Sequence, residues 1–305
     1  MPLFSVDNLT HDYGDVQALT DISLEVPDGA IGLVGANGAG KSTLIKILLG
    51  LLTPTSGDVQ VLGQDVRTHI RQARARVGYM PEGDCLPIDQ SASDFVAYSA
   101  ELAGVPAKAA RRRASESLAL VGIGEERFRY LKDFSTGMFQ RVKLAQAIVH
   151  DPKVVFLDEP TAGLDPEGRE QMLDLVNRLA EYEISVIFST HILSDIERTC
   201  DWVVLLDNGR VKRNGALDRL GSHGIVQIEL IDDPQPTADL LRGRGLTVTV
   251  DGFRMSIPAA EGVTTLVRDA FAESGAGIRS MTETQITLEE AFFEVGPALP
   301  PPVPT

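Results

Sequence analysis

The chain has 305 residues, of which 43% are hydrophobic and 23% charged, and its formal net charge is −15. This length and composition are typical of a soluble globular protein with a substantial core and two domains, and they exclude a chain that is disordered as a whole. Nucleic-acid backbones are bound by concentrated Lys and Arg side chains, so the acidic balance argues against nucleic acid as a partner.

Signals for secretion, membrane insertion and disulfides are missing from the sequence. The first residues lack a basic stretch followed by an apolar one, and no apolar run approaches the ~18 residues of a spanning helix. Cys85 and Cys200 have neither metal-ligand spacing nor a disulfide framework, so we expect thiols in a reducing compartment. If a membrane is involved, we expect another chain to cross it.

The opening residues predict short strands at 3–6, 22–26 and 30–34, with a turn at Asp28-Gly29. Tyr13 lies between the first two strands. A purine base whose phosphates bind farther along the chain could stack on this ring, although a single aromatic residue is more often part of ordinary packing.

Residues 35–43, GANGAGKST, fit the phosphate-binding loop pattern G-x-x-x-x-G-K-[ST]. Glycines let successive backbone N–H groups turn inward toward polyphosphate, Lys41 adds a cation for the β- and γ-phosphates, and Ser42 offers a hydroxyl to Mg²⁺. A strand at 30–34 and a helix at 43–52 give the required context. We expect nucleotide contacts from Gly35, Ala36, Asn37, Gly38, Ala39, Gly40, Lys41, Ser42 and Thr43.

The next segment predicts strands at 57–62 and 76–80 and then a helical insert. Its helices are expected at 91–103 and 107–121. In the first, Phe95, Ala97, Tyr98 and Leu102 supply an apolar face. The basic cluster of Lys108, Arg111, Arg112 and Arg113 is read as a solvated helix face.

Two adjacent carboxylates follow a buried strand farther along the chain. Ser135 is expected to cap a helix that ends before Asp151-Pro152, and residues 154–157 form an apolar strand that leads into Asp158 and Glu159. A helix at 168–180 and a strand at 184–188 come next, and His191 follows that strand. Open α/β sheets place ligand chemistry at the carboxyl ends of their strands, which favours functional roles for these side chains.

The residues after 221 predict a separate unit. Strands at 225–230, 246–250, 253–257 and 278–283, with helices at 236–241 and around 263–271, follow the order β-α-β-β-α-β of a ferredoxin-like fold. Thr287 and Glu290 predict a capping box for a short last helix that carries Phe292 and Phe293. The proline-rich end, 297–305, is expected to be unstructured.

The ordered set of motifs resembles the ATP-binding cassette (ABC) family, the nucleotide-binding subunits of ABC transporters, over about residues 3–220. Residues 35–42 match the Walker A motif and residues 154–158 match Walker B. Residues 162–165 match the D-loop. The resemblance implies an α/β P-loop NTPase domain with an antiparallel β-subdomain and a helical subdomain at about 84–150, followed by a small α+β ferredoxin-like domain at 221–296.

The resemblance also implies site roles. Glu159, His191 and Lys41 would be catalytic, ATP would be the substrate nucleotide, and Mg²⁺ would be held by Ser42, Glu82 and Asp158. Further nucleotide contacts would come from Tyr13 of the A-loop, Glu82 of the Q-loop, Ser135 and Gly137 of the signature motif, and Asp165 of the D-loop.

Two motifs depart from the family pattern. The signature Leu-Ser-Gly-Gly-Gln is here residues 134–138, FSTGM, so Thr136 brings a side chain where glycine is usual. Glu82 stands where the Q-loop has glutamine. We interpret both as subfamily variation because the catalytic acid, lysine and histidine remain.

The resemblance implies partners as well. Two copies would face head to tail, with Ser135 and Gly137 of one copy covering the nucleotide on Lys41 of the other. A transmembrane permease subunit would be driven from the cytoplasmic side of the cell membrane. The C-terminal unit resembles the tail of exporter subunits for drugs, lipids or polysaccharides, so export is the expected direction.

Two other functions remain open at this point. A soluble ABC-type ATPase could act on ribosomes or DNA, but the chain has a single cassette, no long heptad insert between Lys41 and Ser135, and an acidic balance. A module that closes on ATP without hydrolysing it is suggested by the altered signature. RNA-stimulated or DNA-stimulated hydrolysis would favour the first alternative, and absent phosphate release the second.

Overall fold

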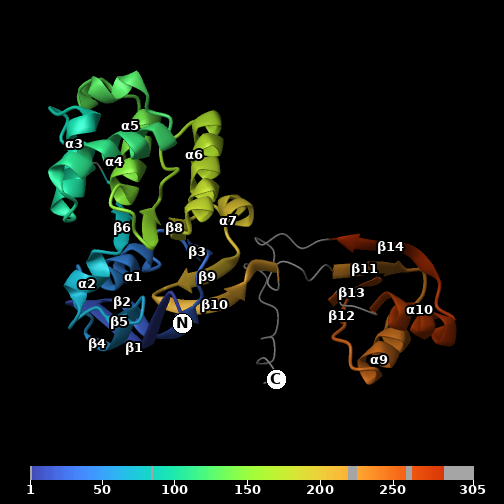
Figure 1. Cartoon of the computed structure of the whole chain (residues 1–305). Coiled ribbons are helices and arrows are strands. Elements are labelled where there is room, and N and C mark those ends of the chain that lie inside the picture. The colour runs from blue at the N-terminus through green and yellow to red at the C-terminus, as the bar shows by residue number, and fades with distance from the viewer. Residues whose placement is uncertain (1, 84, 219–224, 259–262, 285–305) are drawn as a thin grey trace. The chain divides into compact units, whose positions relative to one another are not determined.

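The computed structural model (Figure 1) describes residues 2–83, 85–218, 225–258 and 263–284. The chain divides into two compact units, Met1–Ala216 and Leu217–Thr305, and each has a hydrophobic cluster of its own. In these described ranges, no helix is both long and apolar enough to cross a bilayer. The predicted last helix at Thr287–Phe293 and the proline-rich end lie outside the described residues.

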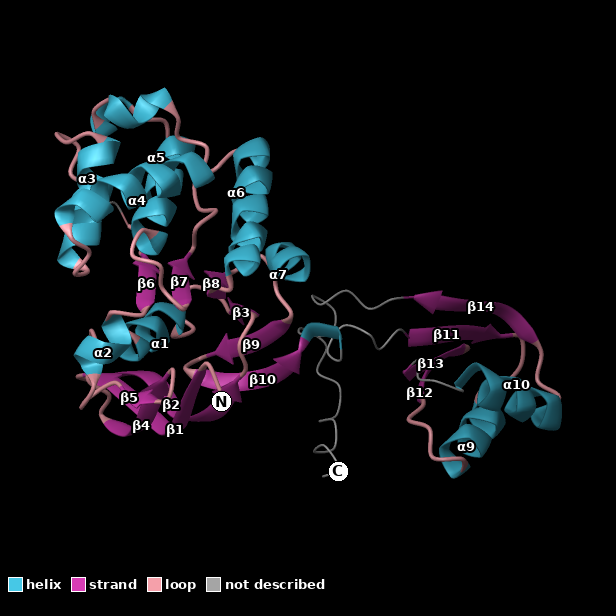
Figure 2. Ribbon diagram, in the orientation of Figure 1, coloured by secondary structure: helices cyan, strands magenta, loops and turns pink. Residues whose placement is uncertain are grey.

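A six-stranded sheet forms the centre of the first unit (Figure 2). Its order is β10-β9-β3-β8-β7-β6, with every neighbouring pair parallel except β10 and β9. The strands are β3 (Ala30–Val34), β6 (Val77–Met80), β7 (Val154–Asp158), β8 (Ser185–Thr190), β9 (Trp202–Asp207) and β10 (Arg210–Ala216). The neighbours β3, β8 and β7 therefore bring the phosphate loop, His191 and the two carboxylates to one edge of the sheet.

A second, antiparallel sheet has the order β2-β1-β4-β5. It consists of β1 (Phe4–Tyr13), β2 (Val16–Val26), β4 (Ser56–Val61) and β5 (Gln64–Asp65). The sequence predicts only the start of β1 and the end of β2. Bulges interrupt the alternation of apolar and polar residues in between, since the register of β1 with β2 shifts between Val6 and Asp12. Tyr13 is the last residue of β1, beside the turn at Gly14.

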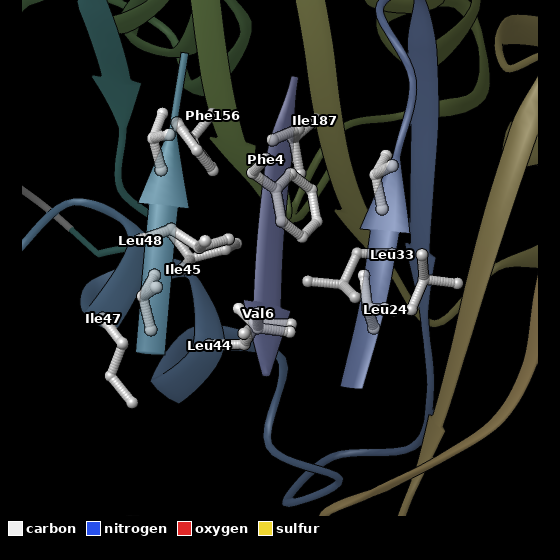
Figure 3. Packing of buried hydrophobic residues seen from close by; sticks show 14 of the residues in the cluster. Phe4, Val6, Leu24, Leu33, Leu44, Ile45, Ile47, Leu48, Phe156 and Ile187 are labelled. Atoms are coloured by element: carbon white, nitrogen blue, oxygen red, sulfur yellow. The ribbon is translucent and has the colours of Figure 1, made fainter. Parts of the chain in front are cut away.

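Helix α1 (Lys41–Leu48) lies between the two sheets. Its residues Leu44, Ile45 and Leu48 are buried among side chains of β1, β3, β7 and β8 (Figure 3). A helix with apolar residues on most of its faces is stable only when it is covered on several sides. The packing of α1 therefore fixes the phosphate loop that precedes it. The expected start at residue 43 is wrong, since Gly40 is the N-cap and the helix begins at Lys41.

The helical part of this unit contains α3 (Ala92–Leu102), α4 (Ala107–Leu120) and α5 (Thr136–Ile148), with a short 3-10 turn, η1 (Glu125–Phe128), beside α3. The predicted apolar face of α3 is only partly right, because Ala97 is buried and Phe95 is half-buried, but the other two residues are not. Tyr98 is 54% exposed and Leu102 71%, whereas Val96 and Ala100 are buried. The small residues let α3 and α4 approach closely, so the large side chains are turned outward.

The remaining elements of the unit are α2 (Ile70–Arg74), η2 (Leu131–Asp133), α6 (Pro166–Arg178), η3 (Leu179–Tyr182) and α7 (Leu193–Thr199). Helix α6 starts two residues before the expected 168. Asp165 is its N-cap and accepts a hydrogen bond from the backbone N–H of Gly168 at 2.9 Å. Pro166 then occupies the first turn, where a missing N–H costs little.

The second unit contains a four-stranded antiparallel sheet of order β12-β13-β11-β14. Its elements are β11 (Ile225–Leu230), α9 (Gln235–Gly243), β12 (Thr249–Asp251), β13 (Arg254–Pro258), α10 (Val263–Ser274) and β14 (Ile278–Thr284). The element order is the predicted β-α-β-β-α-β. The strand expected at 246–250 is misplaced. Arg242 donates a 2.9 Å hydrogen bond to the Val248 carbonyl, and the strand starts only at Thr249.

Candidate functional site

The phosphate loop joins the end of β3 to the start of α1, and two of its glycines leave no room for a side chain. A Cβ on Gly35 would lie 2.4 Å from the Leu206 carbonyl oxygen. Gly40 has a left-handed φ of 104°, and its Cβ would lie 2.8 Å from the Ala18 carbonyl oxygen. The loop is thus held in shape by the neighbouring backbone, as a cradle of N–H groups requires.

Lys41 lies against this loop and is 6% exposed. Its Nζ donates to the carbonyl oxygens of Gly35 at 2.7 Å and Ala36 at 3.4 Å, and it lies 3.6 Å from Oε1 of Glu159. The ammonium therefore joins the loop to the acidic end of β7. A cation with so little water around it attracts anions more strongly than an exposed one.

Glu159 follows β7 and is 7% exposed. Its Oε2 lies 3.1 Å from Nδ1 of His191, while Oε1 is a buried atom without a hydrogen-bond partner among the described residues. Its backbone has a φ of 50°, a left-handed conformation that a residue with a side chain adopts at some cost. The carboxylate is therefore held between Lys41 and His191 by an unusual backbone turn.

Asp158 ends β7 and is buried. Its Oδ1 accepts hydrogen bonds from Ser42 at 3.3 Å and from Ser189 at 2.6 Å. The sequence reasoning missed Ser189, which lies directly beside Asp158 in the parallel pairing of β7 with β8. Its position two residues before His191, at the end of a predicted strand, was the signal that could have found it.

The oxygens of Ser42 and Asp158 fit a magnesium ion. Both are hard donors, and Mg²⁺ is usually held by one or two protein groups together with substrate phosphates and water. Across the part of the chain that the structure describes, no cluster of three or more His, Cys, Asp and Glu side chains could hold a metal alone. A metal at this site would therefore depend on a bound nucleotide.

Glu82 is not brought into this cluster. Its side chain is exposed, and no hydrogen bond or ion pair described for it reaches Ser42 or Asp158. Its backbone carbonyl instead accepts a 3.0 Å hydrogen bond from Lys143, a buried lysine of α5. This contact links the Q-loop to the helix that follows the signature motif.

Tyr13 lies at the end of β1 and is 48% exposed. Its ring meets the ring of His11 edge to face, with centroids 4.7 Å apart and an interplanar angle of 90°. The neighbouring strand β2 touches the phosphate loop, because a Cβ on Gly40 would lie 2.7 Å from Leu19. An exposed aromatic ring therefore lies on the sheet that supports the loop.

The signature residues line a hollow that is separate from the phosphate loop. Ser135 caps α5 by accepting a 3.3 Å hydrogen bond from the N–H of Met138, as predicted. Ser135 and Gly137 line a hollow of about 510 Å³ together with Gly163 and Asp165 of the D-loop. No residue of the phosphate loop lines this hollow. Within one chain, the structure does not join the signature residues to Lys41.

A buried acid, which the sequence reasoning also missed, lies behind the D-loop. Asp195 of α7 is 1% exposed, accepts a 3.1 Å hydrogen bond from the Thr161 hydroxyl, and accepts a 2.7 Å hydrogen bond from Nε of Arg169. It thereby connects the segment after Glu159, the first turns of α6 and the helix after His191.

Comparisons with known proteins agree with this geometry. The family model described as ABC transporter matches residues 19–162. An ABC transporter ATP-binding protein of Bacillus subtilis is 36% identical over 219 residues, which cover 72% of each chain. The chain belongs to the ATP-binding proteins of ABC transporters. It is therefore a nucleotide-binding ATPase subunit of a transporter.

Some relatives align with almost the whole chain, and two of them carry names that state a role. A daunorubicin resistance ATP-binding protein of Streptomyces coeruleorubidus is 31% identical over 299 residues, covering 95% of both chains. A bacitracin transport ATP-binding protein of Bacillus licheniformis is 30% identical over 300 residues, covering 96% of this chain and 97% of its own. These ABC subunits are thus similar to both units of the chain.

Solved structures share the fold of the first unit. The ATP-binding subunit of an ABC transporter superposes with a TM-score of 0.64 at 32% identity, over 72% of this chain and 92% of its own. A dimeric ATP-binding cassette in a post-hydrolysis state, bound to ADP and Pi, has a TM-score of 0.64 at 23% identity, over 70% of this chain and 98% of its own. The latter likeness concerns the fold alone.

Proposed function

We propose that the chain hydrolyses ATP at sites shared by two copies of itself and thereby powers export through a separate membrane subunit on the cytoplasmic side of the membrane. The observation that carries the hydrolytic part is the cluster of Lys41, Asp158, Glu159 and His191 at one edge of the sheet. The export direction is supported by the daunorubicin resistance relative, which aligns over both units, because removal of a drug is a route to resistance.

Phosphoryl transfer has a loose transition state, so the protein mainly positions groups and stabilises charge. Lys41 and the loop N–H groups bind the β- and γ-phosphates, and the base stacks on Tyr13. Ser42 and Asp158 would hold Mg²⁺, with Glu82 a further candidate. A bound Mg²⁺ supplies positive charge that neutralises phosphate oxygens. Ser189 keeps the Asp158 carboxylate directed toward Ser42.

Glu159 is the group that activates water. Its carboxylate orients the attacking water and accepts its proton, and the geometry fits because the same carboxylate lies 3.6 Å from the lysine that holds the phosphates. His191 contacts the other carboxylate oxygen at 3.1 Å, so it orients Glu159 and can also donate to a γ-phosphate. The described site thus contains a cation that binds the phosphates, a base that activates water, and a group that orients this base.

The signature motif completes the site of a second copy. Ser135 and Gly137 line a hollow apart from their own phosphate loop, and Asp165 of the same hollow caps α6. The N-terminus of the 13-residue α5 carries a partial positive charge that favours phosphate. A head-to-tail pair of chains would put this helix end over the nucleotide on the partner's loop.

The helical part is the surface that we assign to the membrane subunit. Several large apolar side chains are exposed on or near α3 and η1, and exposed patches of this kind mark interaction sites. Their exposed fractions are Ile88 59%, Tyr98 54%, Leu102 71%, Phe128 62% and Tyr130 54%. The link from Lys143 to Glu82 gives this part a direct connection to the edge of the sheet. We assign the second unit as a ferredoxin-like accessory domain.

Capture of the membrane subunit tests this function. The tagged full chain should co-purify from solubilised membranes with a polytopic membrane protein, which should increase its rate of ATP hydrolysis. Leu102→Glu should weaken this capture. Tyr182→Glu serves as the control, because Tyr182 is 51% exposed but lies in η3, outside the helical part. Thermal unfolding of both variants checks that each remains folded.

Two results would contradict the proposal. Stimulation of hydrolysis by RNA or DNA in place of a membrane protein would favour the soluble ATPase. An absence of steady-state phosphate release from the chain, alone and with its membrane subunit, would favour a module that binds ATP without hydrolysing it.

A further inference from the structure

His11 is a buried histidine that the mechanism does not use. It is 8% exposed, and both of its ring nitrogens are buried without a hydrogen-bond partner among the described residues. Buried polar groups in native proteins are nearly always paired, because an unpaired group loses its hydration without compensation. An unpaired imidazole at this position therefore requires an explanation.

The contact that His11 does make is with Tyr13. The two rings are perpendicular, with centroids 4.7 Å apart. This arrangement puts the positive edge of one ring against the negative face of the other, which is a favoured geometry for aromatic pairs. If the imidazole edge is the one that points at Tyr13, an N–H directed at the ring face gives a buried nitrogen a weak partner.

The backbone around the pair is fixed by Thr55. Its N–H donates a 2.9 Å hydrogen bond to the Thr10 carbonyl, and its hydroxyl accepts a 3.0 Å hydrogen bond from the N–H of Asp12. These two hydrogen bonds fix the path of the backbone up to Tyr13. Gly14, with a φ of 62°, then turns the chain into β2. What remains adjustable is the side-chain orientation of Tyr13, which is 48% exposed and contacts His11 on one side.

The pair also lies close to the phosphate loop. His11 is opposite Leu19 in the pairing of β1 with β2, and Leu19 closes the space beside Gly40. A nucleotide whose phosphates bind on the loop therefore has His11 and Tyr13 on the adjacent sheet.

We propose that His11 is a positioning residue for the nucleotide base: its ring supports the Tyr13 ring from beneath and holds it in the orientation on which the base stacks. This inference rests on the proposed function, because it needs the base to bind at Tyr13. Since the His11 nitrogens are buried, the imidazole acts through the tyrosine and makes no contact with the base itself. A preoriented ring lowers the ordering cost of binding.

Four variants of the full chain test the inference: His11→Ala, His11→Phe, Tyr13→Ala and the double variant His11→Ala/Tyr13→Ala. The equilibrium affinity for ATP is measured by calorimetry, and the affinity for inorganic tripolyphosphate is measured in the same way. The interaction free energy of an aromatic pair corresponds to about a fivefold loss of ATP affinity in His11→Ala. The loss should appear in KM more than in kcat.

Three further results are expected if His11 acts through Tyr13. Tripolyphosphate should bind His11→Ala as it binds the unaltered chain, because it has no base. His11→Phe keeps a ring edge and should retain most of the ATP affinity. In the Tyr13→Ala background, His11→Ala should cause no further loss. His69→Ala, at an exposed histidine, is the control.

The outcomes separate the possible failures. Unchanged ATP affinity in His11→Ala overturns the inference, and so do additive losses in the double variant. Weakened binding of tripolyphosphate shows instead that His11 supports the phosphate loop through Leu19, which also overturns it. If Tyr13→Ala binds ATP normally, the base does not stack there and that part of the proposed function fails. If Tyr13→Ala is weakened and His11→Ala is not, the role of His11 alone is wrong.

Discussion

The ammonium of Lys41 lies 3.6 Å from a carboxylate oxygen of Glu159, and the two side chains are only 6% and 9% exposed. They come from distant parts of the sequence and meet because β3 and β7 both border β8. A phosphate held on Lys41 is therefore beside the carboxylate that activates water. This one contact sets the distance between the binding and the hydrolytic halves of the site.

Glu159→Gln should keep ATP binding and stabilise the ATP-bound dimer while hydrolysis collapses, because the amide cannot accept a proton from water. Steady-state phosphate release measures the loss, and size-exclusion chromatography with ATP measures the dimer. Glu181→Gln, at an exposed glutamate of η3, is the matched control. Turnover at the unaltered rate in Glu159→Gln would remove this residue from its role.

Lys41→Ala should weaken ATP binding by about 2 kcal/mol, the usual worth of a hydrogen bond to a charged group. It should also lower stability, because it leaves the Glu159 carboxylate buried without its cation. The double variant Lys41→Ala/Glu159→Gln should recover part of that stability in urea unfolding. If the double variant is less stable than Lys41→Ala, the ion pair is not what stabilises this region.

Mixing two inactive variants tests the shared site. Lys41→Ala removes the cation that binds the phosphates, and Gly137→Asp puts a negative charge on the signature motif. A Cβ at residue 137 would lie 3.8 Å from Leu164, so a side chain fits there. Each variant alone should be inactive, whereas a mixture should regain hydrolysis, since one site of each mixed dimer carries neither change. A mixture as inactive as its components would place the signature outside the partner's site.

Asp195→Ala should destabilise the first unit by about 2 kcal/mol, because it leaves the buried Thr161 hydroxyl without its acceptor and removes the carboxylate paired with Arg169, whose side chain is 29% exposed. The loss of an acceptor for Thr161 and Arg169 should also lower hydrolysis more than ATP affinity. Asp195→Asn is the milder comparison, since it keeps the shape and one oxygen. Urea unfolding measures the stability, and a loss below about 0.5 kcal/mol, the range of ordinary surface changes, would contradict the prediction.

His150 should make the chain less stable in mild acid. Burial lowers the pKa of His150 below its ordinary value of 6.5, against an opposing hydrogen bond with the Val77 carbonyl at 3.1 Å. The unfolded chain then binds more protons between the two pKa values, so this contribution to stability is complete above about pH 6.5 and is lost as the pH falls through the folded pKa. His150→Gln should flatten the unfolding free energy between pH 7 and pH 5, whereas the exposed His69→Gln should not. Equal slopes for all three proteins would refute this.

The elements that carry chemistry were the easiest to predict. The phosphate loop, the strand before Asp158 and the cap at Ser135 depend on local signals: glycine spacing, an apolar run and a hydroxyl before a helix. The central sheet could be expected because parallel strands bring the residues at their carboxyl ends together. These signals are local in sequence and leave little choice of conformation.

Other features could not be predicted because they depend on packing. The buried side of α3, which includes Val96 and Ala100, depends on the packing of this helix against α4 and α5, which the periodicity of its own residues does not show. Ser189 and Asp195 act through partners that lie 26 to 34 residues away in the sequence. The bulges of β1 break the alternation by which strands are recognised.

The left-handed backbone of Glu159 has a consequence for engineering. Glycine or asparagine would adopt a φ of 50° more easily than glutamate, but either replacement would leave the buried Lys41 ammonium without its carboxylate. A replacement at this position therefore removes both the water-activating group and the counter-charge of Lys41, and relief of the backbone strain does not make it stabilising. Thermostable versions of this subunit therefore have to be sought at other positions, with turnover measured beside the melting temperature.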